Sequence, residues 1–415
     1  MPGANPLTTL SRDVRLLFLT RFLRLFSYGA LAVVLVLYLT GLGLSASETG
    51  LLLTLTLLGD TAVSLCLTTQ ADRIGRRRML IVGAILMAGA GLTFATTHNF
   101  VFLVIAGTIG VISPSGNEVG PFLPIEQAAL SHVVAPKERT MTFAWYSLTG
   151  SLATAAGSLF AGFVAQGFTG SGAAPLAGDR AILFAYAAMG VVLGLAFWRL
   201  SPAAEVERQG NAGVSARTLL GVGPSRRVVF QLAGLFALDA FGGGFVVQSF
   251  AAYWFYLRYG VSSATLGSIF FGANVFAGIS ALLASRLAAR IGLVETMVFT
   301  HLPSNVLLLL VPVMPNLKLA VLVLLLRFSI SQMDVPTRQS YTMAIVQPQE
   351  RSAAAGITGV ARTTGAALAP FFAGLLFARH ALINVPFFLA GGLKIVYDLL
   401  LYRAFVRHRP PEEVV

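Results

Sequence analysis

The stretch from Glu126 to Phe163, EQAALSHVVAPKERTMTFAWYSLTGSLATAAGSLFAGF, recurs 212 positions later, from Arg338 to Leu375, as RQSYTMAIVQPQERSAAAGITGVARTTGAALAPFFAGL. In this ungapped alignment Pro136-Lys137-Glu138-Arg139 falls on Pro348-Gln349-Glu350-Arg351. A charged corner repeated at constant spacing does not follow from a shared Ala/Gly-rich composition. The sequence therefore predicts two copies of one structural unit that run in the same direction.

The repeat continues upstream with an offset of 217. Leu42-Gly43-Leu44-Ser45 matches Tyr259-Gly260-Val261-Ser262, and Ala71-Asp72-Arg73-Ile74-Gly75 matches Ala288-Ala289-Arg290-Ile291-Gly292. The two copies thus cover most of the chain. A parallel repeat in an apolar chain is typical of membrane transporters built from two bundles.

The composition predicts a protein that is embedded in a membrane. Of the 415 residues 56% are hydrophobic and only 11% are charged, which is more apolar surface than a soluble fold of this length can bury. Strands are excluded, because the apolar runs are long and do not alternate. The runs of membrane-spanning length are 14–41, 48–71, 79–97, 100–133, 140–166, 180–199, 228–257, 265–287, 295–314, 318–345, 352–378 and 383–405.

These runs predict an all-α polytopic membrane protein with twelve transmembrane helices in two pseudo-symmetric six-helix bundles. The expected N-terminal bundle is 1–199, and the expected C-terminal bundle is 228–415. The polar stretch between them, 200–227, is expected to be a cytoplasmic linker.

The net charge of +12 is distributed unevenly across the predicted spans. Nineteen Lys and Arg residues lie near one side, whereas the loops of the other side hold Arg180, Arg258, Lys318 and Arg379. By the positive-inside rule both termini are predicted to be cytoplasmic, and we expect a multi-pass protein of the bacterial cytoplasmic (inner) membrane. The basic charge then reflects topology and contact with membrane lipids, so no nucleic-acid partner is expected.

Enzyme chemistry finds no support in the sequence. The lone Cys66 lies inside a predicted helix, and the five histidines are scattered without metal-ligand spacing, so neither a metal nor a cofactor is expected. No G-x-x-x-x-G-K-[ST] phosphate-binding loop occurs, which argues against ATP hydrolysis. The chain is therefore not expected to be an enzyme.

The loop after the second predicted span, from Ala71 to Arg78, reads ADRIGRRR. It resembles G-x-x-x-D-R-x-G-R-R, the loop signature of the major facilitator superfamily, at the place where that family carries it. Thr68 replaces the first Gly, and the matching residues are Asp72, Arg73, Gly75, Arg76 and Arg77.

The resemblance implies transport by alternating access, with helices one, four, seven and ten lining a central cavity. It also implies that Asp72 and its neighbours form a cytoplasmic latch on one access state. Gly75 permits a tight turn, and the arginines can cap helix ends or pair with acids. The second copy, Ala289-Arg290-Ile291-Gly292, lacks the acid, so the latch would be asymmetric. The alternative is a basic loop that only sets topology.

The fifth predicted span carries Gly157-Ser158-Leu159-Phe160-Ala161-Gly162, where many antiporters of that superfamily have G-P-x-x-G-G. Ser158 and Ala161 depart from the pattern. Close helix packing through small residues is the simpler explanation of this stretch.

The fourth predicted span holds three prolines and two glycines between Ile112 and Glu126. Proline removes a backbone donor and clashes with the preceding turn, so this helix is predicted to be broken. A broken helix within a membrane persists beside a cavity or where side chains satisfy its carbonyl groups. A purely structural kink is the alternative.

Charged residues within spans are costly and face cavities or partners. The predicted substrate and proton cavity is lined by Arg21, Arg24, Asn117, Glu118, Asp239, Arg327 and Asp334. Glu118 is the first candidate for the proton-carrying carboxylate, with Asp239 in reserve. Asp334 with Arg338, and Lys394 with Asp398, are four residues apart, so each pair is expected to interact along its own helix.

Glu126 and Arg338 occupy equivalent positions of the two copies. A pseudo-twofold axis along the membrane normal would place them at the same depth in opposite bundles. They are therefore a candidate gate pair that closes the cytoplasmic side when the protein opens outward. The competing interpretation holds Arg338 on Asp334 and leaves Glu126 facing the cytosol.

The sequence thus predicts a secondary active transporter, a proton-coupled exporter of a small organic or amphiphilic compound. Its expected partners are the small-molecule substrate, protons or another coupling ion, and lipids, and it is expected to be a monomer. An importer or antiporter of an organic anion is the first alternative, favoured by Arg21, Arg24, Arg327 and Arg338. A non-transporting receptor or scaffold on the same fold is the second.

Overall fold

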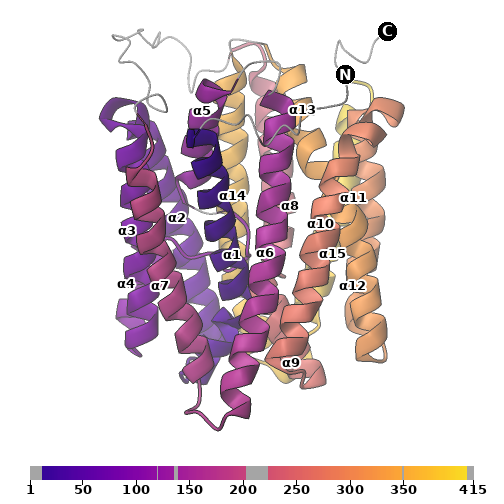
Figure 1. Ribbon diagram of the computed structural model, residues 1–415. Helices are drawn as coiled ribbons and strands as arrows, with labels where there is room; N and C mark the ends of the chain where they lie inside the picture. The colour runs from indigo at the N-terminus through magenta and orange to yellow at the C-terminus, as the bar shows by residue number, and fades with distance from the viewer. Residues whose placement is uncertain (1–11, 119, 135–138, 202–222, 348–349, 409–415) are drawn as a thin grey trace, which may run out of the picture.

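The computed structural model describes residues 12–118, 120–134, 139–201, 223–347 and 350–408. Within these ranges the chain is helical, and the helices lie side by side along one common direction (Figure 1). Ten candidate spans in these ranges, one of which joins two consecutive helices, are long and apolar enough to cross a membrane.

The first half of the chain contributes seven helices that form six spans. They are α1 (Arg12–Gly41), α2 (Ala46–Ile74), α3 (Arg76–Thr96), α4 (Phe100–Ile109), α5 (Phe122–Val133), α6 (Arg139–Gly170) and α7 (Ala177–Trp198). The short helices α4 and α5 together make the fourth span. The prediction of a broken fourth helix is confirmed, since residues 110–118, 120 and 121 between them are not helical.

The second half repeats this order with two more broken spans. Its helices are α8 (Arg226–Gly244), α9 (Gln248–Tyr259), α10 (Ser263–Ile291), α11 (Leu293–Leu310), α12 (Leu317–Ser331), α13 (Asp334–Ile345), α14 (Arg351–Phe377) and α15 (Val385–Phe405), with the short 3-10 turns η4 (Val311–Val313) and η6 (His380–Leu382). The pairs α8–α9 and α12–α13 make the seventh and tenth spans. The predicted all-α fold of twelve spans in two six-helix bundles is thereby confirmed.

The two ends of the helix array differ in charge. We call the end at which α1 begins and α15 ends the basic end, at the top of Figure 1, because α3 begins there with Arg76-Arg77-Arg78 and α8 with Arg226-Arg227. The other end is called the far end. Helix α7 ends at Trp198 and α8 begins at Arg226, and residues 202–222 of the predicted linker lie outside the described part.

Helix α1 forms the centre of the first half. Tyr28, Leu31, Val34 and Tyr38 are each fully buried, and together they cover more than one face of the helix. A helix that is apolar on all sides is stable only when neighbours surround it. The hydroxyl of Tyr38 donates to the carbonyl of Phe94 at 2.8 Å, so the polar tip of this core residue is satisfied as well.

Two glycine contacts hold the halves together toward the far end. A Cβ added to Gly50 on α2 would lie 2.8 Å from Cα of Gly374 on α14. A Cβ added to Gly267 on α10 would lie 2.9 Å from Cα of Gly162 on α6. At such distances only glycine lets the two backbones approach, as in other close helix pairs within membranes.

These two contacts are copies of each other. The offset of 217 takes Gly50 to Gly267, and the offset of 212 takes Gly162 to Gly374. The repeat therefore builds one glycine contact on each side of the pseudo-twofold axis. The position of Gly162 within the antiporter-like stretch of the fifth span is explained by this packing, as the simpler interpretation of that stretch held.

Hydrogen bonds between the halves lie at mid-depth or nearer the far end. Ser249 on α9 donates both its backbone N–H and its hydroxyl to the carbonyl of Pro114, at 3.1 and 2.6 Å. The Gln248 amide donates to the Ser158 hydroxyl at 3.2 Å, and the backbone N–H of Phe371 donates to the Thr54 hydroxyl at 2.9 Å. The bond to Pro114 satisfies a carbonyl that the broken fourth span leaves free.

Candidate functional site

A buried cluster of two arginines and two glutamates occupies the basic half of the first bundle. Arg24 and Glu126, both fully buried, form two parallel hydrogen bonds of 2.7 Å. Arg24 also reaches Glu118 at 3.0 Å, and Arg21 pairs with the same Glu118. The four charges cancel, as burial in a membrane requires.

Neighbouring side chains fix this first cluster in place. The hydroxyl of Thr20 donates to Glu126 at 3.0 Å, and that of Tyr146 also donates to Glu126. The guanidinium of Arg24 lies 4.7 Å from the ring centre of Phe122. The break after α4 supplies Glu118, while α1 and α5 supply Arg24 and Glu126, so broken span four and span one build the cluster together. Glu118, with 16% of its side chain exposed, is the most accessible member.

A second buried cluster occupies the second bundle and has the opposite polarity. Here span seven supplies the acid, Asp239, and span ten supplies the base, Arg338, at 3.0 Å. Arg338 also contacts Asp334 at 3.2 Å, the pairing expected from their spacing. Asp239 accepts a further bond of 2.6 Å from Lys394 on α15.

Glu126 and Arg338 do not contact each other in this conformation, and their role as a gate pair in an outward-open state stays a prediction. Each residue is buried and neutralised within its own half, Glu126 by Arg24 and Arg338 by Asp239 and Asp334. The repeat preserves an ion pair between the first and fourth spans of each half but exchanges its charges. Equal depth in opposite halves does not bring the two side chains together, because each finds a partner on an adjacent helix.

The predicted pairing of Lys394 with Asp398 is wrong. Lys394 binds Asp239, whereas Asp398 accepts hydrogen bonds from His301 and Asn305 of α11 at 2.8 and 2.9 Å. His301 was not among the residues that the sequence predicted for the site. A signal was present, since His301 and Asn305 are four residues apart on one face of an apolar helix, where polar side chains need partners.

Three other charged side chains in the spans have no ion pair among the described residues. Asp60, midway along α2, is 9% exposed, and its Oδ1 has no hydrogen-bond partner there. Arg327 on α12 lies 4.9 Å from the ring centre of Phe328, and its buried Nε also lacks a partner in the described part. Arg362 on α14 is exposed. Asn117, predicted to line the cavity, is exposed in the break between α4 and α5.

The loop that resembles the superfamily signature forms the sharp turn between α2 and α3. Gly75 has φ 119°, a backbone conformation that side chains disfavour, and it both ends α2 and begins α3. Arg76 is buried, and Arg77 donates to the carbonyl of Leu200 at 3.4 Å. Asp72 and Arg73 lie in the last turn of α2, and their side chains are outside the described part.

The second copy of the Pro-x-Glu-Arg corner fastens two helix ends together. Glu350, just before α14, accepts from the backbone N–H of Ser225 at 3.1 Å and from that of Gly223, at the start of α8. Hydrogen bonds from Ser225 and Gly223 hold the pKa of Glu350 below its ordinary value. This contact stabilises the fold at neutral pH and is lost as the pH falls through the lowered pKa. The first copy, Pro136 to Glu138, lies outside the described residues.

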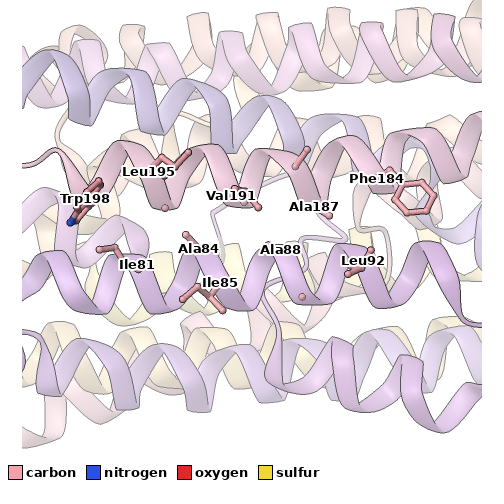
Figure 2. A pocket seen from close by; sticks show the side chains of 14 residues that line it. Ile81, Ala84, Ile85, Ala88, Leu92, Phe184, Ala187, Val191, Leu195 and Trp198 are labelled. Atoms are coloured by element: carbon pink, nitrogen blue, oxygen red, sulfur yellow. The ribbon is translucent and has the colours of Figure 1, made fainter.

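A groove of about 770 Å³ between α3 and α7 is separate from both clusters. Figure 2 shows its labelled side chains along the two helices, with Trp198 toward one end and Phe184 toward the other. Ile85 and Val191 are 63% and 57% exposed, and the lining is almost wholly apolar. Exposed apolar side chains on membrane-spanning helices face lipid, so this groove belongs to the outer surface of the bundle.

The fold and the clusters define a class of protein. Twelve spans in two pseudo-symmetric halves, with broken helices and charges buried within the spans, are the architecture of secondary transporters. A family model described as Major Facilitator Superfamily matches residues 17–332 and, in a second match, 232–415. The chain belongs to this superfamily of membrane transporters.

Comparison with individual proteins gives the same picture. The membrane protein YJR124C of Saccharomyces cerevisiae is 30% identical over 424 residues, covering 95% of this chain and 94% of that protein. Quinolone resistance protein NorA of Staphylococcus aureus (strain MRSA252) is 27% identical over 157 residues, 38% of this chain and 39% of NorA.

Solved structures with the same fold include two transporters of low sequence identity. A bacterial homologue of the human lysosomal transporter Spinster, inward-facing and occupied, has a TM-score of 0.74 at 15% identity and covers 98% of this chain and 99% of its own. The nucleoside transporter NupG has a TM-score of 0.71 at 14% identity and covers 96% and 100%. At these identities the likeness concerns the fold alone.

Proposed function

We propose that this protein is a proton-coupled exporter of a small organic or amphiphilic compound. The observation that carries the proposal is the buried ion-pair cluster in each half, placed where a broken span meets the first span of that half. Titratable groups are expensive inside a membrane and mark pathways for ions and protons. The partial similarity to NorA, a quinolone resistance protein, supports the direction of transport.

We propose further that the basic end faces the cytoplasm, as the positive-inside rule predicts. Contacts between the halves through Gly50–Gly374 and Gly162–Gly267 lie toward the far end, which would then be the closed outer side. This conformation would be inward-facing, with 1–199 and 228–415 rocking about the glycine contacts. The bacterial inner membrane and the monomeric state stay predictions from the sequence.

Glu118→Gln is expected to abolish transport driven by a proton gradient while substrate binding and exchange persist. Glu118 is the most exposed carboxylate of the first cluster and the one shared by both arginines, so its protonation would release Arg21 and Arg24 together. Uptake and efflux in proteoliposomes, with and without a pH gradient, measure this. Full concentrative transport by Glu118→Gln would remove Glu118 from the coupling mechanism, and Asp239→Asn is then the next variant to test.

The substrate can be found by a thermal-shift screen of the purified protein against metabolites and drugs at two pH values. A ligand that binds only the folded state raises Tm, and a proton-coupled transporter should bind it with pH-dependent affinity. Binding that does not vary with pH would argue against proton coupling.

An organic-anion transporter is the second candidate, favoured by one observation. Arg21, Arg24 and Arg338 are already neutralised by carboxylates, but Arg327 and Arg362 have no ion pair in the described part of the chain. Two cations that lack a carboxylate partner among the described residues would attract a carboxylate or sulfonate substrate. The organic anion transporter MFSD10 shares the fold, with a TM-score of 0.60 at 17% identity, coverage of 94% of this chain and 99% of its own. Preferential binding of anions in the same screen would favour this candidate.

We also propose that Asp72, Arg73, Gly75, Arg76 and Arg77 act as the latch that the family resemblance implies. Gly75→Val is expected to slow turnover about tenfold without changing substrate affinity, because strain of roughly 1–2 kcal/mol at a positive φ disturbs the turn and not the cavity. Gly43→Val at the far end, also at positive φ, is the matched control and should have a smaller effect. Unaltered turnover in Gly75→Val would argue against the latch and favour a loop that only sets the membrane topology.

The receptor or scaffold alternative makes no use of the ion pairs. A protein that does not transport has no reason to keep carboxylates neutralised at mid-membrane in both halves, since their burial only costs free energy. Ligand binding without movement of the ligand across a vesicle membrane would favour that alternative.

A further inference from the structure

His301 lies between two carboxylates in the interior of the second half. It is 4% exposed; its Nδ1 is 2.8 Å from Oδ1 of Asp398, and its Nε2 is 3.7 Å from Oδ1 of Asp239. Asp398 is fully buried, and its other oxygen accepts from the Asn305 amide at 2.9 Å. Three helices, α8, α11 and α15, therefore converge on one imidazole.

Both ring nitrogens of His301 face carboxylate oxygens, so their hydrogen-bond geometry requires protons. Nδ1 and the Asp398 oxygen, 2.8 Å apart, need one proton between them. With that proton in place, a bare Nε2 would point its lone pair at the carboxylate of Asp239, which repels it. A second proton on Nε2 turns this contact into an attraction between an imidazolium and a carboxylate.

The charges that are in direct contact with one another favour the same protonation. Asp239, Asp334 and Asp398 are three acids, and the bases in contact with them are Arg338 and Lys394. Among these directly contacting groups, an imidazolium at His301 gives a net charge of zero, whereas a neutral imidazole leaves one negative charge to be balanced from farther away. Two further neighbours complete the surroundings: Arg327 on α12, which forms no ion pair among the described residues, and the ring of Tyr397, whose centre is 5.8 Å from that of His301.

We propose that His301, together with Asp398, is a proton-binding site that is loaded and unloaded during the transport cycle. In one access state the imidazole takes a proton from water at Nε2 and becomes an imidazolium. In the other access state it returns this proton to water. This inference rests on the proposed function and adds a site in the second half to Glu118 in the first.

The contacts of Asp239 explain how such a proton would move the helices. Oδ1 of Asp239 is shared between Lys394, at 2.6 Å, and His301, while Oδ2 accepts from Arg338 on α13. Loading His301 strengthens its hold on Asp239 and weakens the competing bonds. Both α8 and α13 border a break in their span, so the charge at His301 acts on the half-helices best able to shift.

The test is a pH titration of full-length protein labelled with 15N-histidine and purified in detergent, followed by NMR from pH 5 to 9. We expect the His301 signal to move from the imidazolium to the neutral position within this range. Asp398→Asn should shift the transition about one pH unit lower, because the imidazolium loses an anionic partner. Asp398→Asn also identifies the signal without a variant of His301 itself. His98→Gln, an exposed far-end histidine, should leave the transition unchanged.

A His301 signal that stays constant from pH 5 to 9, or that Asp398→Asn fails to shift, would overturn the inference. These outcomes are separate from the fate of the proposed function. A titrating His301 in a protein whose transport ignores the pH gradient supports the site and refutes proton coupling. If the His301 signal does not change with pH while transport is still driven by a pH gradient, the site is refuted. Glu118 then remains the candidate for proton coupling.

Discussion

Gly50→Leu and Gly267→Leu are each expected to hold the far end open and to stop the transport cycle. A Cβ at either position would lie 2.5–2.6 Å from a carbonyl oxygen of the opposite half, that of Pro370 or of Ser158. Neither obstacle is a flexible side-chain end, so the helices must separate. Overpacking costs about 1–3 kcal/mol, which reduces the closed population by roughly 5- to 150-fold.

The distance between spin labels at His98→Cys and His380→Cys reports this change, in a Cys66→Ser background. Both sites are exposed at the far end, one in each half. The distance distribution should shift to longer values in Gly50→Leu and Gly267→Leu, and further in the double variant. Gly89→Leu, where an added Cβ meets nothing within 4 Å, is the matched control and should resemble the parent. Unchanged distances in both variants would contradict the role given to the glycine contacts.

Arg24→Met is expected to lower the free energy of unfolding by about 3–5 kcal/mol, the range for breaking a buried ion pair. Arg24 is fully buried, and without it Glu126 keeps, among the described residues, the hydroxyl groups of Thr20 and Tyr146 as its partners. Tm in detergent and yield from membranes measure the loss.

Two companion variants separate pairing from packing. Arg24→Met/Glu126→Met should recover much of the stability, since removing both partners leaves no uncompensated charge. Arg21→Met should cost less, because its partner Glu118 keeps Arg24 and is partly exposed. Equal losses in the single and double variants would show that the pair itself contributes little.

The fold could be predicted because the features that specify it can be read from the sequence without knowing which distant residues contact each other. These features are the apolar runs of membrane-spanning length and the repeat at constant offset. The break in span four followed from its prolines, but the breaks after Gly244 and Ser331 did not, although three consecutive glycines, Gly242 to Gly244, precede the first. Glycine permits a break without requiring one, so tertiary contacts such as Ser249 to Pro114 decide.

The charged residues were predicted, but most of their partners were not. Spacing along one helix revealed Asp334 with Arg338 and misled for Lys394 with Asp398. The partners of Glu126, Asp239 and Asp398 lie on neighbouring helices, about 100 to 150 residues away in the chain for the strongest contacts. Tertiary packing determines which helix faces contact each other, and this cannot be read from a single sequence.

The proposed mechanism is alternation of this chain between two access states under the control of protons. It is tested most directly by measuring both ends of the substrate-free protein from pH 5 to 9. The far-end label pair, His98→Cys and His380→Cys, is compared with a basic-end pair, Gln70→Cys and Ala355→Cys, which join the same two halves. We expect that, as pH changes, the distance within one label pair shortens while that within the other lengthens, in the same proportion of molecules. Distributions at both ends that do not change across this range would contradict it.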